Sequence, residues 1–263
     1  MRESIEIAGA RLEYRHRRPV VDRPLGPVIL LHPWFGCWQF WRQTVDALPE
    51  FETYAVDLYS LGARNNWPDF ASPRGLAQAV SVMTEKLGIR RCSLIGNSMG
   101  GIAAQALSAA QPDRIEKLIL VGTGARIVGL KPDYRQTVDN WIAGAVNREA
   151  TMQLVDALLA RRPADPREFE TFVDMVFNAN KAFMGSVLTS AFDLDLRPLL
   201  PEITAATLVI RGEFDAARTR THVEELLAGI PNSKAAEIPG AGHSPQVDSP
   251  QAFAKLVRDF FLA

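Results

Sequence analysis

Three polar residues that could together carry out acyl transfer lie in turns that follow apolar runs. Ser98 is the centre of Gly-Asn-Ser-Met-Gly, Asp215 follows Gly-Glu-Phe, and His243 follows Gly-Ala-Gly. A serine hydroxyl is a poor nucleophile at neutral pH and needs an adjacent base. Imidazole, with an unperturbed pKa of about 6.5, suits that task, and a carboxylate can fix its tautomer. The residue types therefore indicate a nucleophile, a base and an orienting acid.

The motif around Ser98 predicts a sharp turn between a strand and a helix. An apolar run precedes it at 92–95, and the stretch 101–107 reads as a helix. A nucleophile at such a turn has a strained backbone that lifts its hydroxyl clear of the strand. Gly96 and Gly100 fit, because larger side chains would collide in so tight a bend. Short motifs also occur by chance, so a glycine-rich turn that only packs stays an alternative until a base and an acid are found.

The base is assigned by elimination among the four histidines. His16 lies among arginines and is expected to be solvated, and His222 is expected at the surface in the first turn of a helix. His32 follows an apolar strand, where we expect it to brace a loop by hydrogen bonding. His243 remains as the candidate base, in a glycine-rich loop after the last predicted strand. A loop histidine that only satisfies its own hydrogen bonds is the plainer interpretation.

Two carboxylates compete for the role of the acid. Glu213 and Asp215 both follow the apolar run 206–211. A strand that ends near Gly212 leaves Asp215 farther out on the loop, where it can turn towards His243. Spacing alone does not resolve the two, so Glu213 stays open as the rival.

Short apolar runs alternate with helical patterns along most of the chain, which predicts a parallel sheet covered on both faces. An antiparallel hairpin is expected at the edge, from Ile5–Ile7 and Leu12–Tyr14. The parallel strands are expected at 28–31, 54–56, 92–95, 117–122, 206–211 and 235–238. In such a sheet, function gathers at the carboxyl ends of the strands, and Ser98, Asp215 and His243 all follow strands.

The alternation stops between about residues 126 and 200. Apolar residues there recur at helical spacing in four stretches, and no strand pattern interrupts them. The chain is therefore expected to form a core from 1–125 and 201–263, with a helical cap inserted at 126–200. A helical subdomain that only packs is the alternative, although long insertions are often functional.

Composition limits the classes of partner. The 263 residues carry a net charge of −1, are 47% hydrophobic and contain no long run of one sign, so neither a nucleic acid nor a membrane surface is expected to bind. No apolar signal-peptide core and no segment long enough to span a membrane is present. Cys37 and Cys92 make no disulfide framework or metal-site spacing. We expect a cytoplasmic protein that acts on a small molecule without a metal or cofactor, as a monomer or homodimer.

The order serine, aspartate, histidine resembles that of the α/β-hydrolase family. Residues 28–36 look like the family's strand and oxyanion loop, 96–101 like its nucleophile elbow, 212–215 like its acid loop and 240–243 like its histidine loop. The helical insertion resembles the family's cap. The resemblance covers essentially the full chain. It implies a mostly parallel, twisted sheet of about eight strands, with helices on both faces.

The resemblance also implies an oxyanion hole made by two backbone amides. One is that of Met99, at a helix N-terminus where the helix dipole favours negative charge. The other is that of Trp34, since His32-Pro33-Trp34 is similar to the family's usual His-Gly-X. Pro33 departs from that pattern. A proline has no amide to donate, but it leaves the amide of Trp34 in place and stiffens the loop.

Aromatic residues cluster beside this loop, at Trp34, Phe35, Trp38, Phe40 and Trp41. Some of them are expected to form the wall of an apolar substrate pocket. Phe35 is expected to contact the substrate, together with Trp141 of the insertion. Trp38 and Trp41 lie three apart on a predicted helix, where core packing is the better interpretation.

These features favour a serine hydrolase that cleaves a carboxylic ester or lactone of a small, largely apolar substrate through an acyl-enzyme. A carbon–carbon bond hydrolase of the meta-cleavage-product type is the first alternative, because Gly96–Gly101 is similar to the elbow of that subfamily. Its members typically have tryptophan after the histidine, whereas Ser244 follows here. A receptor that keeps the hydrolase fold but binds its ligand without turnover is an alternative of another class.

Overall fold

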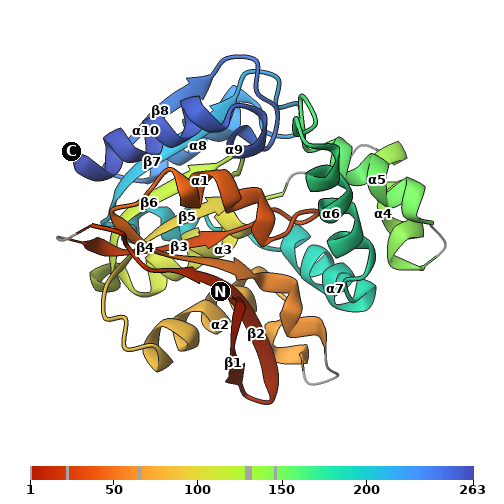
Figure 1. Ribbon diagram of the computed structural model, residues 1–263, viewed down its shortest axis with the longest axis horizontal. Helices are drawn as coiled ribbons and strands as arrows, with labels where there is room; N and C mark the ends of the chain where they lie inside the picture. Colours follow the sequence, from red (N-terminus) through yellow and green to blue (C-terminus); the bar gives the residue numbers. More distant parts are fainter. Residues whose placement is uncertain (1, 22–23, 64–66, 128–131, 145–146) are drawn as a thin grey trace.

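A single sheet of eight strands is the centre of the computed structural model, within the part of the chain that it describes, residues 2–21, 24–63, 67–127, 132–144 and 147–263 (Figure 1). The strands are β1 (Arg2–Ile7), β2 (Ala10–Arg17), β3 (Leu25–Leu31), β4 (Phe51–Asp57), β5 (Cys92–Asn97), β6 (Ile115–Val121), β7 (Ala206–Gly212) and β8 (Ser233–Ile238). Their order across the sheet is β1-β2-β4-β3-β5-β6-β7-β8.

The first two strands are antiparallel to their neighbours and all the later pairs are parallel. The predicted edge hairpin and the predicted parallel strands are thus confirmed, each strand being somewhat longer than its apolar run. The four apolar residues 28–31 of β3 are completely buried, as expected for a strand covered on both faces.

Helices cover both faces of the sheet. On one face lie α2 (Pro73–Lys86), α3 (Met99–Ala110) and α8 (Arg220–Gly229), and on the other α1 (Arg42–Asp46) and α10 (Pro250–Leu262). A short helix, α9 (Pro245–Asp248), precedes α10 and was not predicted. Short 3-10 helices complete the described part: η1 (Trp38–Trp41), η2 (Leu58–Ala63), η3 (Pro68–Phe70), η4 (Pro112–Arg114) and η5 (Arg197–Glu202).

Side chains from the two helical layers form two apolar clusters, one on each face of the sheet. Trp41 is fully buried against Phe253 of α10, with ring centroids 6.2 Å apart, so its predicted core role is confirmed. Trp38 is only half-buried and stacks under the guanidinium of Arg15. Each fully buried large apolar side chain stabilises the fold by roughly 1.5–3 kcal/mol.

The helix signals in the sequence had mixed outcomes. Ser72 caps α2, accepting a hydrogen bond from the amide of Gly75 at 2.9 Å, as its position before a proline predicts. Thr221 and Glu224 have the spacing of a capping box, which predicts Thr221 as the capping residue of α8. The capping residue is instead Thr219, whose amide donates to Nδ1 of His222. The helix therefore begins two residues earlier than the pattern suggests, because a histidine takes the place of the usual glutamate.

The segment between β6 and β7 forms four helices in its described part: α4 (Pro132–Ile142), α5 (Arg148–Asp156), α6 (Pro166–Phe177) and α7 (Lys181–Phe192). They gather on one side of the sheet, in green to teal in Figure 1. Residues 128–131 and 145–146 of the predicted insertion lie outside the described residues. The two ends of the segment meet, since Leu196 donates its amide to the carbonyl of Ala125 at 2.9 Å.

None of the helices in the described ranges combines the length and the apolar character needed to cross a membrane.

Candidate active site

Ser98 lies between β5 and α3 in a conformation that L-residues rarely adopt, with φ of +53° and ψ of −113°. Such a backbone costs of order 1–3 kcal/mol and persists only where neighbouring groups impose it. Here the Ser98 amide donates to the carbonyl of Val121 at 2.9 Å, and the hydroxyl of Thr123 donates to the Ser98 carbonyl at 2.8 Å. Both partners come from the neighbouring strand β6 and the residues just after it, so the strain is held by the sheet.

The two glycines of the motif are required by close approach. A Cβ at Gly100 would collide with the carbonyls of Leu31 and His32, at the end of β3. A Cβ at Gly96 would lie 2.7 Å from the Cα of Gly101 in the first turn of α3. The predicted need for small residues on both sides of Ser98 is confirmed.

Asp215 and His243 are joined by a hydrogen bond. The distance from Asp215 Oδ2 to His243 Nδ1 is 2.9 Å, and both side chains are buried. The other carboxylate oxygen accepts from the amides of Ala217 and Arg218, each at 2.9 Å. Burial alone would raise the pKa of Asp215, but the His243 charge and these hydrogen bonds outweigh it and hold the pKa below its ordinary value. An ionised carboxylate only accepts, so Nδ1 carries a proton, and in the neutral form of the imidazole Nε2 then has its lone pair free.

The rival acid, Glu213, has a different partner. Its exposed side chain accepts a hydrogen bond from the amide of Gly240 at 2.8 Å. The chain turns after Gly212, where β7 ends, and this turn directs Asp215 inwards and leaves Glu213 at the surface. Of the two carboxylates that spacing left open, Asp215 is the one bonded to His243.

The ends of three strands converge around Gly122, the residue after β6, whose φ is +48°. A Cβ built there would lie 2.7 Å from the carbonyl oxygen of His243, 3.1 Å from Asp215 Oδ2 and 3.2 Å from Asn97 Nδ2. Asn97 directly precedes Ser98, so the three predicted residues belong to loops that touch. The Ser98 hydroxyl makes no hydrogen bond within the described part of the chain. Such contacts are often formed only when substrate is bound.

Asn97 joins the serine loop to the histidine loop, a role that sequence reasoning did not foresee. Its Nδ2 donates to the carbonyls of Val121 and His243, both at 3.0 Å. Its Oδ1 accepts from the hydroxyl of Ser244 at 3.0 Å and from the amide of Gln246 at 2.8 Å. Asn97, Ser244 and Gln246 are all fully buried. The side chain therefore uses two donors and two acceptor positions to fix the backbone around His243.

His32 braces the loop after β3, as predicted. Its Nδ1 contacts the carbonyl of Pro33 at 2.8 Å, and its Nε2 accepts from the amide of Leu58 at 3.0 Å. Because Nε2 accepts, the proton is on Nδ1 and the fully buried ring is neutral. Its hydrogen-bonding atoms are occupied by backbone groups, which leaves it unsuited to act as the base.

The expectation for His16 is wrong. Its side chain is only 13% exposed, stacks on Tyr54 with centroids 4.5 Å apart and bonds Glu52 at 2.8 Å. Neighbouring arginines in the sequence do not report which face of β2 a residue presents, because successive side chains of a strand point to opposite faces. His222 is partly buried as the cap acceptor of α8, and burial lowers its pKa, with the nearby Arg218 charge adding to the effect.

The two amides predicted for an oxyanion hole, those of Met99 and Trp34, have no hydrogen-bond acceptor among the described residues. That of Met99 is the first of the twelve-residue helix α3, where amides lack an intrahelical partner. The segments that carry the two amides touch, since a Cβ on Gly100 would collide with the carbonyls of Leu31 and His32. Two free donors on adjoining loops fit the stabilisation of an oxyanion.

The aromatic residues expected near the substrate pack against one another. Phe35 and Trp141 are fully buried, with ring centroids 5.3 Å apart and ring planes at 90°. Trp34 contacts both, and its indole Nε1 donates to the carbonyl of Met184 in α7 at 2.9 Å. This cluster connects the loop after β3 to the insertion. A contact of Phe35 or Trp141 with substrate stays a prediction.

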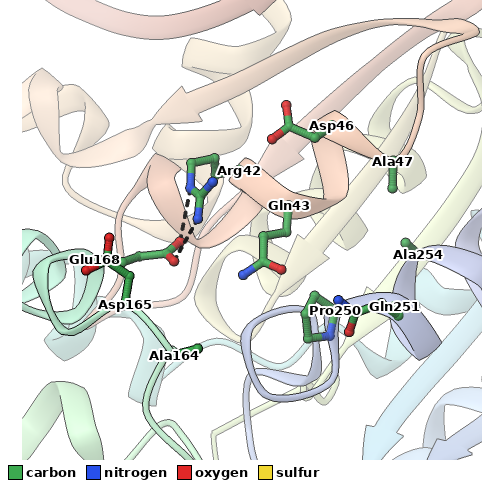
Figure 2. Close-up of a pocket in the computed structure, with 10 residues that line it drawn as sticks. All are labelled: Arg42, Gln43, Asp46, Ala47, Ala164, Asp165, Glu168, Pro250, Gln251 and Ala254. Carbon is green, nitrogen blue, oxygen red and sulfur yellow. Dashed lines mark hydrogen bonds and ion pairs between the residues drawn. The ribbon is translucent and has the colours of Figure 1, made fainter.

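A groove of about 570 Å³ lies elsewhere, between α1, α10 and the start of α6. Figure 2 shows its lining, in which Arg42 of α1 forms an ion pair with Glu168 of α6. Its residues are mostly polar, and Ser98, Asp215 and His243 are not among them. We therefore place the candidate active site at the strand ends.

Comparisons with known proteins point to the same kind of chemistry. The model of the Alpha/beta hydrolase family matches residues 28–256. The pimeloyl-[acyl-carrier protein] methyl ester esterase of Aeromonas salmonicida is 26% identical over 261 residues, which cover 89% of this chain and 95% of that protein. The 2-hydroxy-6-oxo-6-phenylhexa-2,4-dienoate hydrolase of Burkholderia cepacia is 32% identical over 204 residues, which cover 71% and 69%. The structure of the enol-lactonase from Burkholderia xenovorans LB400 matches with a TM-score of 0.84 at 25% identity, covering 99% of this chain and 100% of that one.

Proposed function

This chain belongs to the alpha/beta hydrolase family, and on that premise we propose that it is a serine hydrolase that cleaves a carboxylic ester or lactone through an acyl-enzyme. The substrate is a small, largely apolar molecule. The named activities of the relatives support this class, since they include a methyl ester esterase and an enol-lactonase.

In the first half of the reaction, Ser98 Oγ attacks the carbonyl carbon while Nε2 of His243 takes the hydroxyl proton. Asp215 accepts the Nδ1 hydrogen bond throughout and stabilises the imidazolium. The tetrahedral intermediate then collapses, the bond to the leaving oxygen breaks, and that oxygen receives the proton from His243. An acyl group is left on Ser98. In a lactone, the leaving alcohol stays attached to the acyl chain.

In the second half, water repeats the sequence in place of serine. His243 takes a proton from the water as it attacks the acyl carbon, and then returns a proton to Ser98 as the acid product leaves. In both halves the negative charge develops on the former carbonyl oxygen. We assign its stabilisation to the amides of Met99 and Trp34, assisted by the dipole of α3.

One observation carries the proposal more than any other, the 2.9 Å hydrogen bond between Asp215 and His243. It leaves Nε2 as a free base at the end of the sheet where Ser98 has its strained, positive-φ backbone. Two carboxyl-terminal strand loops far apart in the sequence supply the base and its orienting acid. A glycine-rich turn that only packs has no need of either.

The helical insertion at 126–200 fits the role of a cap over this site, with 1–125 and 201–263 as the core. Phe35 and Trp141 then provide apolar surface at the junction of core and cap, and this supports an apolar acyl or alcohol group.

The test is covalent labelling followed by substrate profiling. A fluorophosphonate should modify Ser98, identified by mass spectrometry of its peptide, and Ser98→Ala should not be labelled. A panel of a p-nitrophenyl ester, a methyl ester, an enol lactone and a thioester then defines the bond that is cleaved. A wild-type protein that binds ligands but neither reacts with the probe nor turns over any ester would instead be a binding protein on a hydrolase fold.

A carbon–carbon bond hydrolase is the second candidate. The 32% identity to a 2-hydroxy-6-oxo-6-phenylhexa-2,4-dienoate hydrolase and the shared type of elbow favour it. Ser244, which follows the histidine, is fully buried and bonded to Asn97. Steady-state rates on a p-nitrophenyl ester and on a vinylogous 1,5-diketone distinguish the two: a larger kcat/KM for the diketone would favour carbon–carbon cleavage.

A further inference from the structure

Two carboxylates outside the proposed chemistry bind the backbone of the histidine loop, residues 239–244. Glu213 accepts from the amide of Gly240 at 2.8 Å, and Asp248 accepts from the amide of Gly242 at 2.7 Å. Glu213 is exposed, whereas Asp248 is only 4% exposed. Hydrogen bonds from amides to an ionised carboxylate are among the stronger ones in proteins. The two carboxylates therefore hold the loop at two points, in addition to its contacts with Asp215 and Asn97.

Asp248 differs from Glu213 in having a second set of partners, on the helical insertion. Its Oδ1 accepts from the amides of Ala160 at 3.0 Å and Arg161 at 3.2 Å. These two residues belong to the connection between α5 and α6. One carboxylate thus binds the insertion through one oxygen and the histidine loop through the other.

The two segments that Asp248 joins also pack closely. A Cβ built on Gly242 would lie 2.8 Å from the amide nitrogen of Ala160. The guanidinium of Arg161 reaches the carbonyl of Gly240 at 3.4 Å. A displacement of segment 160–161 would therefore act directly on the residue that precedes His243.

Keeping this carboxylate ionised costs stability. Burial raises the pKa of Asp248 above its ordinary value, although the three amide hydrogen bonds and the Arg161 charge oppose the rise. A carboxylate whose pKa is raised by folding destabilises the folded state as the pH rises from its pKa in the unfolded chain to its pKa in the folded protein. A neutral side chain of the same shape avoids that cost. An amide, however, has one acceptor oxygen and cannot accept from both segments, whereas a carboxylate can.

We propose that Asp248 is a positioning residue that couples the helical insertion to the catalytic base: docking of segment 160–161 sets the backbone position of Gly242 and therefore of His243. The inference rests on the proposed function, because it takes His243 as the base. An insertion that moves away from the core would withdraw the support of the base, and hydrolysis would proceed only in the docked arrangement.

The test is Asp248→Asn with Glu213→Gln as the matched control. An asparagine has a single acceptor oxygen, which can accept either from segment 160–161 or from Gly242. Its NH₂ group then faces the backbone amide of the other segment, and two donors cannot bond to each other. A misplacement of about 1 Å can lower turnover by about 100-fold. We expect kcat on a reactive ester to fall by about 10- to 100-fold with KM nearly unchanged. Glu213→Gln keeps an acceptor for the amide of Gly240, so its kcat should stay within about two-fold of the wild-type value.

Amide hydrogen exchange supplies a readout that needs no variant. In the wild-type protein, the amides of Ala160, Arg161 and Gly242 should share one protection factor, because one opening event exposes all three. Fast exchange at 160 and 161 with full protection at Gly242 would overturn the coupling, as would wild-type kcat in folded Asp248→Asn. The failure of the proposed function looks different. In that case the wild-type protein itself would not be labelled at Ser98 by a fluorophosphonate.

Discussion

The strand-end loops of the core and the helical insertion are held in place by different kinds of contact. The core loops at 96–101, 212–215 and 239–244 bond to one another through buried groups, with Asn97 and Asp215 at the crossing points. The insertion meets the core at scattered points, which include the Trp34 indole on the Met184 carbonyl, the Asn180 side chain on the Gly62 carbonyl and the half-exposed Arg42 on Glu168.

This difference suggests a division of tasks. The geometry of bond cleavage depends on short distances among core residues, which the sheet fixes. The choice of substrate depends on the side chains of the insertion, whose packing can vary without disturbing the sheet. Substitutions in the two regions should therefore separate kcat from KM, and the following five are ordered by the size of the expected effect.

Ser98→Ala should have the largest effect. If the serine acts as the nucleophile, kcat should fall by about a million-fold, because the three residues act as a unit. The measurement is steady-state hydrolysis of a p-nitrophenyl ester. Ser108→Ala is the matched control, since Ser108 is a buried serine of α3 whose hydroxyl donates to the carbonyl of Ala104. The kcat of the Ser108 variant should stay within about two-fold of the wild-type value. Substantial hydrolysis by the Ser98 variant would show that another group attacks.

Asp215→Asn should lower kcat by about ten-thousand-fold, because an amide at this position favours the wrong tautomer of His243. Glu213→Gln, two residues away, should leave kcat within about two-fold of wild type, since the Glu213 side chain is exposed and bonds the amide of Gly240 rather than His243. The comparison decides between the two acids that follow β7. Equal losses in both variants would show that the whole loop, and not the Asp215 carboxylate, is what matters.

The hydrogen bond between Asp215 and His243 also makes the stability of the fold depend on pH. Folding lowers the pKa of Asp215 below its ordinary value of 3.8, so its ionised form stabilises the folded state above that pH, and the contribution is lost as the pH falls through the lower value. The destabilisation caused by Asp215→Asn, measured by urea unfolding, should therefore be large at pH 6 and smaller near pH 3. A penalty independent of pH would mean that the ionised form is not what the fold stabilises.

Asn97→Ala should lower kcat by about 10- to 100-fold and the free energy of unfolding by about 3 kcal/mol, because it leaves buried partners unpaired around His243. Gln105→Ala is the matched control. Gln105 is another buried amide of the core, and its Nε2 donates to the carbonyls of Gly101 and Gly124, both at 3.1 Å. The Gln105 variant should lose a similar free energy of unfolding but keep the wild-type kcat. Equal kcat in the two variants would remove the positioning role of Asn97.

Trp141→Ala tests the insertion. Loss of a fully buried tryptophan should destabilise the packing there by about 3 kcal/mol and change kcat/KM for long-chain against short-chain esters by about ten-fold. With an acetyl ester, kcat should stay within about three-fold, because the core loops are untouched. Trp141→Phe, which keeps a ring but loses the bond to Thr151, is the milder control. A hundred-fold loss of kcat on the acetyl ester would contradict the division of tasks.

Glu168→Gln should have the smallest effect. Glu168 pairs with Arg42 across the groove in Figure 2, and Arg42 is half exposed. Ion pairs of this kind contribute about 0–1 kcal/mol, so thermal unfolding and turnover should hardly change. A loss of activity comparable with that of Asp248→Asn would mean that this surface pair, and not the buried carboxylate, connects the insertion to the core.

Local pattern was sufficient for most of the fold. The runs 28–31, 92–95 and 206–211 lie in β3, β5 and β7 as predicted, and four helices were expected where α4–α7 are found. The predictions were wrong where a side chain had a partner that the local sequence does not indicate. His16 pairs and stacks across neighbouring strands, and the capping box of α8 uses a histidine at its third position. In each case the partner comes from a register or a turn that periodicity does not report.

Some features of the candidate site follow from the sequence, and others only from the tertiary structure. The residue types, the glycines around Ser98 and the order serine, aspartate, histidine are properties of the sequence alone, because they follow from the needs of a tight turn and of acyl transfer. The selection of Asp215 over Glu213 is a property of the tertiary structure, as are the four bonds of Asn97 and the link that Asp248 makes to the insertion. These contacts join segments up to 149 positions apart. They depend on which strand ends the sheet brings together, and no spacing along the chain encodes that.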